Sequence, residues 1–135
     1  MNKYYRLGLL LIGILLGGFF IYKGLNKHFL SPCKTFDPDS TIPLDYQHVI
    51  TAFCQSGFSK VVGGLQILSG ILLLIPRTRL FGAIMLLPII ANIFLIHLFL
   101  DNRFDELVET GIPLAMTILI ITMSSKNWRG IFNPL

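Results

Sequence analysis

The chain has 135 residues, of which 53% are hydrophobic and only 13% are charged, so it is too apolar for an ordinary soluble domain. Its mean hydropathy of +0.71 predicts an integral membrane protein. The formal net charge is +4, but the basic residues lie singly or in pairs at the ends of apolar runs, which argues against a nucleic-acid-binding protein. The sequence contains no internal repeat, so we expect one membrane domain over residues 1–135.

The first apolar run covers residues 4–22, close to the roughly 20 residues that a membrane-spanning helix needs. Tyr4, Tyr22 and Lys23 at its ends are typical of the flanks of such a helix. A basic start before an apolar core also fits a signal peptide. However, no small-x-small cleavage site follows, and a proline precedes the cysteine in LSPC, residues 30–33, unlike a lipoprotein signal. We therefore predict a retained spanning helix.

The second and third runs cover residues 58–75 and 80–100. Pro76 ends the second run, because proline lacks an amide donor and disfavours helix in the preceding residue. So few residues remain between the two runs that we predict a tight antiparallel hairpin with a short inner turn. The mixed stretch over residues 46–60 either begins the second helix or lies at the membrane interface.

The fourth run covers residues 107–123 and is followed by Lys126, Trp128 and Arg129, a typical interfacial anchor. Since lipid offers the backbone no hydrogen bonds, only helices or closed barrels span it. We therefore predict an all-α bundle of four transmembrane helices in the bacterial cytoplasmic membrane. Cytoplasmic termini place six basic residues inside against five outside and all seven acidic residues outside, and we adopt that orientation.

The two cysteines, Cys33 and Cys54, both lie outside the membrane in this topology. An oxidising exterior would allow a disulfide that pins the first loop onto the bundle, and the alternative is two free thiols. We expect no metal site, because no CxxC motif occurs. We also find no haem ligand pair, iron–sulfur cysteine set or nucleotide-binding loop.

Polar residues interrupt the third run. Pro88 leaves the carbonyl of Ile84 without its usual amide partner, and Asn92 lies one turn further on. A polar side chain that faces lipid is unfavourable, so we expect Asn92 to point inward.

The second run has a stripe of small and polar residues at steps of four, three and four. These residues are Ser59, Gly63, Gln66 and Gly70. Counted from the inner turn, Gln66 stands about 14 Å and Asn92 about 18 Å into the membrane. We therefore predict a contact between Gln66 and Asn92, either as part of a ligand site or as helix packing alone.

His97 lies about 140° around the helix from Asn92, near the outer interface. One interpretation is an interfacial histidine that extends towards water. The other is a pocket in which His97 meets Lys60 and the acids of the loop over residues 101–109, where histidine could pass protons to a bound redox molecule. Lys60 has its own alternative, an interaction with lipid phosphate.

Residues 63–101 resemble the DoxX-like family of small four-helix membrane proteins. The features that carry the resemblance are Gly63, Gln66, Gly70, Thr78, Arg79, Gly82 and Ala83. Gln66 stands where members of that family often have glutamate, so a proton-carrying carboxylate is absent from this position. Relatives in that family include a subunit of a thiosulfate:quinone oxidoreductase, while many members have no settled activity.

Two functional hypotheses follow. In the first, the chain is a membrane subunit or accessory protein of a quinone-linked redox system, and Gln66, Asn92, His97 and Lys60 are candidate ligand-binding residues. Electrons would then come from a partner, because the chain by itself is not expected to be an enzyme. In the second, it is a non-catalytic module that binds membrane lipid or docks a partner protein through the acidic loop 101–109.

Overall fold

The computed structural model describes residues 3–124, and every regular element in that part of the chain is helical. Five α-helices and two π-helical turns follow one another in the order α1 (Lys3–Leu25), η1 (Asn26–Leu30), α2 (Leu44–Gln55), α3 (Phe58–Leu74), α4 (Arg79–Ile96), η2 (His97–Asp101) and α5 (Phe104–Ser124). The expected anchor of Lys126, Trp128 and Arg129 lies outside the described residues.

Three helical segments are long and apolar enough to cross a membrane: Lys3–Leu30, Arg79–Asp101 and Phe104–Ser124. The fourth candidate is α3, which has 17 residues and meets this criterion only together with α2. These two helices are bent by 79° at the break between them. The chain is therefore all-helical with three or four candidate spans, at the positions predicted from the sequence, except that the first segment extends to Leu30.

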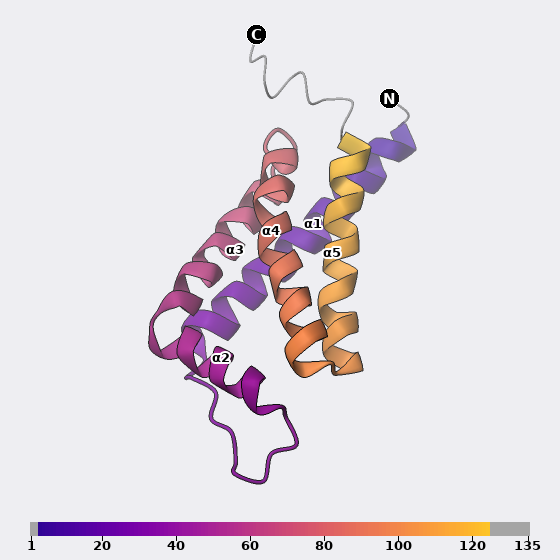
Figure 1. Ribbon diagram of the computed structural model, residues 1–135. Coiled ribbons are helices and arrows are strands. Elements are labelled where there is room, and N and C mark those ends of the chain that lie inside the picture. Colours follow the sequence, from indigo (N-terminus) through magenta and orange to yellow (C-terminus); the bar gives the residue numbers. More distant parts are fainter. Residues whose placement is uncertain (1–2, 125–135) are drawn as a thin grey trace.

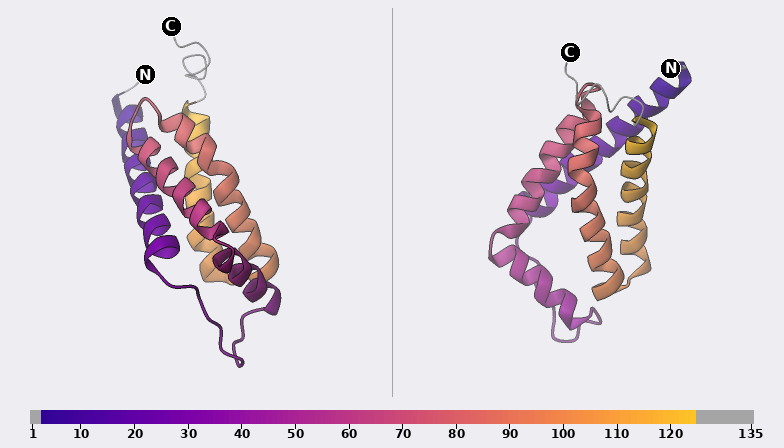
Figure 2. Two further views of the ribbon diagram at one scale, coloured as in Figure 1. Left: turned by 90° about the vertical axis from the view of Figure 1, so that its left-hand side faces the viewer. Right: turned by 45° about the horizontal axis from the view of Figure 1, so that its top comes forward.

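The helices form a bundle in which α3 and α4 make an antiparallel hairpin and α5 lies beside α4 (Figures 1 and 2). The predicted tight turn is confirmed, because Thr78 Oγ1 donates to the Leu72 carbonyl at 2.9 Å across it. Helix α1 packs mainly against α3, and its start meets the end of α5, where the Tyr5 hydroxyl donates to the Met123 carbonyl. The loop over residues 31–43 and α2 lie at the opposite end (Figure 1).

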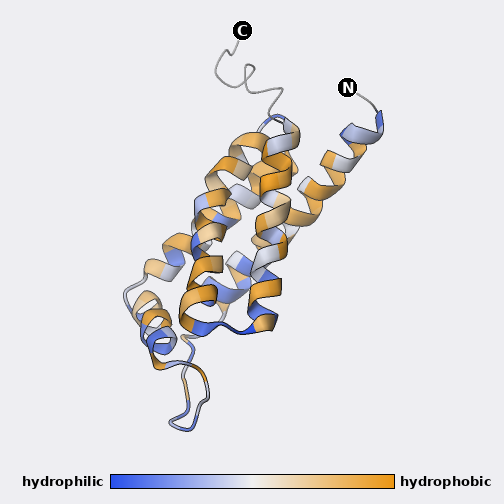
Figure 3. Cartoon of the chain, turned by 45° about the vertical axis from the view of Figure 1, so that its right-hand side comes forward, coloured by the Kyte–Doolittle hydropathy of each residue, from blue (hydrophilic) through white to orange (hydrophobic). Residues whose placement is uncertain are grey.

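An apolar core lies where α1, α3, α4 and α5 meet. Its buried side chains are Leu16, Phe20, Leu73, Ala83, Leu86, Ile90 and Ile120. Many large apolar side chains nevertheless lie on the outside, and Figure 3 shows hydrophobic residues along most of each long helix, with hydrophilic ones gathered at the α2 end. An apolar exterior of this extent suits lipid rather than water.

Glycines bring α1 and α3 into close contact at two levels. A Cβ atom at Gly17 would lie 2.7 Å from the Gly70 carbonyl oxygen, and one at Gly24 would lie 2.8 Å from that of Gly63. The small-residue stripe of α3 therefore faces α1. The predicted contact between Gln66 and Asn92 required this stripe to face α4, so that prediction is wrong. Each pair of glycines lets two backbones approach, as is common between membrane helices.

Two residues with positive φ form the corners at the α2 end. Gly57, with φ 83°, joins α2 to α3, and Asn102, with φ 51°, joins η2 to α5. Glycine has no Cβ to clash in this conformation, and asparagine tolerates it better than most residues. Both π turns lie at the same end, where Ser31 N–H donates to the Asn26 carbonyl and Asn102 N–H to the His97 carbonyl. The polar residues of this end are thus carried by irregular helix termini.

Candidate functional site: a buried polar cluster at the α2 end

His97, the first residue of η2, is only 3% exposed. Its Nδ1 lies 3.2 Å from Oδ2 of Asp101, to which it donates a hydrogen bond, and its Nε2 lies 3.6 Å from Oε2 of Glu106. An interfacial histidine that extends towards water is therefore the wrong interpretation. The imidazole is instead held between two carboxylates from η2 and α5.

Asp101 is the residue around which this arrangement is built. Its side chain is fully buried, and both of its carboxylate oxygens accept a hydrogen bond from Nε of Arg103 at 2.7 Å. Burial opposes the charge of Arg103, but the hydrogen bond and charge of Asp101 outweigh it and raise the pKa of the guanidinium. Arg103 Nη2 also lies 3.6 Å from Glu106, so one cation serves two carboxylates.

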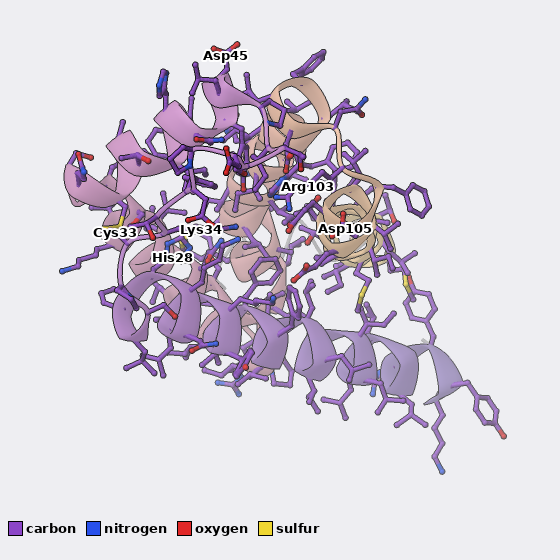
Figure 4. The ribbon with its side chains drawn as sticks, turned by 90° about the horizontal axis from the view of Figure 1, so that it is seen from below. His28, Cys33, Lys34, Asp45, Arg103 and Asp105 are labelled. Atoms are coloured by element: carbon purple, nitrogen blue, oxygen red, sulfur yellow. A yellow bond between two sulfur atoms is a disulfide. The ribbon has the colours of Figure 1, made fainter. Side chains whose placement is uncertain are left out.

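Helix α2 covers the cluster with Tyr46, which is buried. The ring centre of Tyr46 lies 5.4 Å from that of His97 and 5.6 Å from Cζ of Arg103. Burial, together with the negative charges of Glu106 and Asp101, raises the pKa of the Tyr46 phenol. We call Tyr46, His97, Asp101, Arg103 and Glu106 the His97 cluster. In Figure 4, seen from this end, Arg103 lies inside the ring of helices while Asp45 points away from it.

A disulfide between Cys33 and Cys54 fixes α2 in this position. The two Cα atoms lie 5.8 Å apart, a separation that a disulfide spans without distortion. The bond ties the loop over residues 31–43 to the end of the helix that carries Tyr46. Because both cysteines are oxidised, neither serves as a thiolate ligand in this structure.

A second polar group lies between α1 and α3. The side chain of His28 lies against Gly63 and interacts with Gln66. Gln66 is 4% exposed, and its Oε1 has no hydrogen-bond partner among the described residues. Buried amide oxygens are nearly always paired, so this one is available to a hydrogen-bond donor.

Two lysines of the first helical segment connect this group with the His97 cluster. Lys23 forms an ion pair with Glu109, and Lys27 interacts electrostatically with Glu106 and Glu109. Of the acids in the loop over residues 101–109, only Asp105 has no ion-pair partner within residues 3–124. Most of the negative charge of the predicted docking loop is therefore neutralised internally.

Two of the four predicted ligand residues are exposed. Asn92 is exposed, which makes the prediction that it points inward wrong, and its amide donates to the Pro88 carbonyl of its own helix at 2.7 Å. That local hydrogen bond satisfies one donor and lowers the cost of facing lipid. Lys60 is exposed as well and makes no ion pair within the described part of the chain. Gln66 and His97 are buried at the polar end.

Sequence reasoning missed His28 and Tyr46. The first span was expected to end at residue 22, which put His28 in a loop, whereas the helical segment continues to Leu30. Tyr46 enters the site because the chain turns back at Gly57, and one glycine in a mixed stretch does not specify such a turn. Within residues 3–124, no group of three or more His, Cys, Asp or Glu side chains is arranged to hold a metal ion.

Comparison with known proteins gives one informative match. No protein-family model matches the chain, and no match was found among the solved structures. The chain is 36% identical over 118 residues to the uncharacterized protein YwoB of Bacillus subtilis (strain 168), and the match covers 84% of this chain and 74% of that protein. The chain therefore belongs to the same family as YwoB.

Proposed function

We propose that this chain is a four-span protein of the bacterial cytoplasmic membrane and acts as an accessory or membrane subunit of a quinone-linked redox system. The observation that carries the proposal is the buried His97 held between Asp101 and Glu106 at one end of an otherwise apolar bundle. Burying ionisable groups in a membrane protein costs free energy, so such groups are rare, and those that occur often take part in proton transfer.

The membrane arrangement follows from the helix geometry. If α3 crosses the bilayer beside α1, α4 and α5, its 79° bend lays α2 close to the membrane plane. Cytoplasmic termini then put the His97 cluster and the disulfide on the outer side, where oxidation of cysteines is favoured. The resemblance of residues 63–101 to DoxX-like proteins supports the same four-span plan.

The residues at the polar end fit the head of a quinone. Gln66 Oε1 lacks a donor, and a quinol hydroxyl supplies one. Lys27 interacts with Glu106 of the His97 cluster, and His28 interacts with Gln66. These two residues of η1 would give the quinone head hydrogen-bond donors beside the acceptor on Gln66. In this proposal Gln66 orients the quinol hydroxyl.

Proton transfer is the chemistry that we assign to His97. Conversion of a quinone to a quinol consumes two electrons and two protons, and we assign the electrons to a partner oxidoreductase. His97 passes a proton inward from Nε2, and the half-buried Glu106 beside it returns one from the outer solvent. Asp101 and Arg103 keep the imidazole oriented but do not transfer protons.

Mass spectrometry of the small molecules that co-purify after gentle detergent extraction tests the proposal. We expect quinone in the wild type, and its loss from Gln66→Leu and His97→Asn. Asn92→Leu is the matched control, since it makes the same amide-to-leucine change on the exposed face of α4.

Quinone retained by both folded site variants would refute the site. Lipid alone in every sample, together with a co-purifying protein that is lost on Asp105→Asn, would favour the non-catalytic lipid-binding or assembly role.

A further inference from the structure

At the other end of the bundle, Arg79 is a buried cation. It is the first residue of α4 and is 7% exposed, and its side chain lies against α1 beside Gly13. Its Nε donates to the carbonyl of Leu73, near the end of α3, at 3.1 Å. A cation is favourable beside the carbonyls at a helix C-terminus, so part of the placement of Arg79 is accounted for by helix capping.

Capping leaves one terminal nitrogen of the guanidinium unsatisfied. Nη2 of Arg79 is buried without a hydrogen-bond partner in residues 3–124, and the structure gives Arg79 no ion pair there. A guanidinium carries five N–H donors in a fixed fork that matches two oxygens of one anion. Within residues 3–124 the structure therefore supplies no acceptor for Nη2.

No acidic residue of the chain lies near enough to supply that acceptor. The seven acids are Asp37, Asp39, Asp45, Asp101, Asp105, Glu106 and Glu109, all in the loop before α2, in α2, or at the η2–α5 corner. The described residues at the Arg79 end instead include three exposed basic side chains, Lys3, Arg6 and Arg77. A buried charge without a counter-charge is strongly unfavourable, and no acidic side chain supplies one here, so an anion from outside the protein would stabilise this end.

We propose that Arg79 binds a phosphate group at the junction of α1 with the α3–α4 turn, and that in the membrane this phosphate belongs to the headgroup of an anionic phospholipid. Two phosphate oxygens fit the guanidinium fork, and the first amides of α4 add a favourable helix N-terminus. The exposed basic residues around the site attract an anionic leaflet. This inference depends on the proposed membrane location but not on the redox role, because it concerns the opposite end of the bundle.

Native mass spectrometry of the full chain with equimolar phosphatidylglycerol and phosphatidylcholine tests the proposal. We expect the wild type to retain phosphatidylglycerol with a preference of about tenfold. Arg79→Met should abolish the preference. Arg77→Met removes an exposed arginine of the same turn, which contributes only screened long-range attraction, so it should lower the preference far less than Arg79→Met does.

Several outcomes would overturn the proposal. An equal retention of both lipids by the wild type does so without any variant. If Arg79→Met does not fold, Arg79→Lys decides: it keeps the charge but loses the fork, so the preference should fall several-fold, and an undiminished preference contradicts a guanidinium site. Inorganic phosphate is added in a separate arm, and displacement of the bound lipid by phosphate alone would overturn the lipid assignment in favour of a free anion.

Discussion

Replacing Gly17 by alanine tests the close contact between α1 and α3. A Cβ atom at Gly17 would lie 2.7 Å from the carbonyl oxygen of Gly70 and 3.0 Å from a methyl carbon of Leu74. Overpacking costs about 1–3 kcal/mol, and the upper half applies here because a backbone carbonyl cannot rotate away. Alanine regains about 1 kcal/mol of helix propensity over glycine. The net expectation is a free energy of unfolding lowered by about 1–2 kcal/mol.

The neighbouring Gly18 supplies the control, since a Cβ atom there would meet nothing within 4 Å. Gly18→Ala should therefore gain only the helix propensity, and the two variants should differ by about 2–3 kcal/mol. Unfolding by increasing fractions of a denaturing detergent in mixed micelles, followed by near-ultraviolet circular dichroism, measures this difference. Equal stabilities of the two variants would refute the proposed helix packing.

Three further predictions concern the polar end. Cys33→Ser removes a disulfide between residues that are 21 positions apart in the sequence. In the loop-entropy model this should lower the free energy of unfolding by about 3 kcal/mol relative to oxidised wild type. No change would contradict the role of the disulfide in fixing α2. The Tyr46 phenol should have a pKa above its ordinary value of 10.0, so the contribution of the neutral phenol to the free energy of unfolding is complete below pH 10.0 and is lost as the pH rises above it. The measurement is an alkaline absorbance titration of wild type minus Tyr46→Phe. An ordinary midpoint would refute the burial of Tyr46. Asp101→Asn removes the nearer and fully buried of the two carboxylates that pair with Arg103 and should destabilise the fold by about 2–3 kcal/mol, in the same detergent assay. Lys60→Gln, an exposed change, is the control, and equal effects would count against the cluster.

The positions of the long helices could be predicted because apolar length is a property of the sequence alone. The turn between α3 and α4 was equally accessible, since Pro76 and the few residues after it leave room for nothing longer. Which helices contact each other could not be derived in this way. A stripe of small residues fits any partner, and Gly63 and Gly70 face α1 instead of α4.

The predicted contact of Gln66 with Asn92 failed for a related reason. It assumed that an amide in an apolar helix must find a partner on another helix, whereas Asn92 donates to the carbonyl of Pro88 one turn earlier. His97 lies at the end of α4, as its place in the sequence predicts, but its burial depends on the 79° bend between α2 and α3 at Gly57. Depth follows from the rise per residue, while burial depends on a tertiary corner that residue spacing does not encode.

The two π turns, η1 and η2, determine how the polar end is rotated relative to the apolar helices before it. Each π turn accommodates one residue more than the α-helical turn that it replaces. Deletion of one residue between His97 and Asp101 would close the π turn and change the angle between these two side chains by about 100°. The angle between His97 and its partner Asp101 is thus set by the π turn and not by the helix before it. A one-residue insertion or deletion in η2 can therefore reposition Asp101 relative to His97 without any change in the sequence of α4.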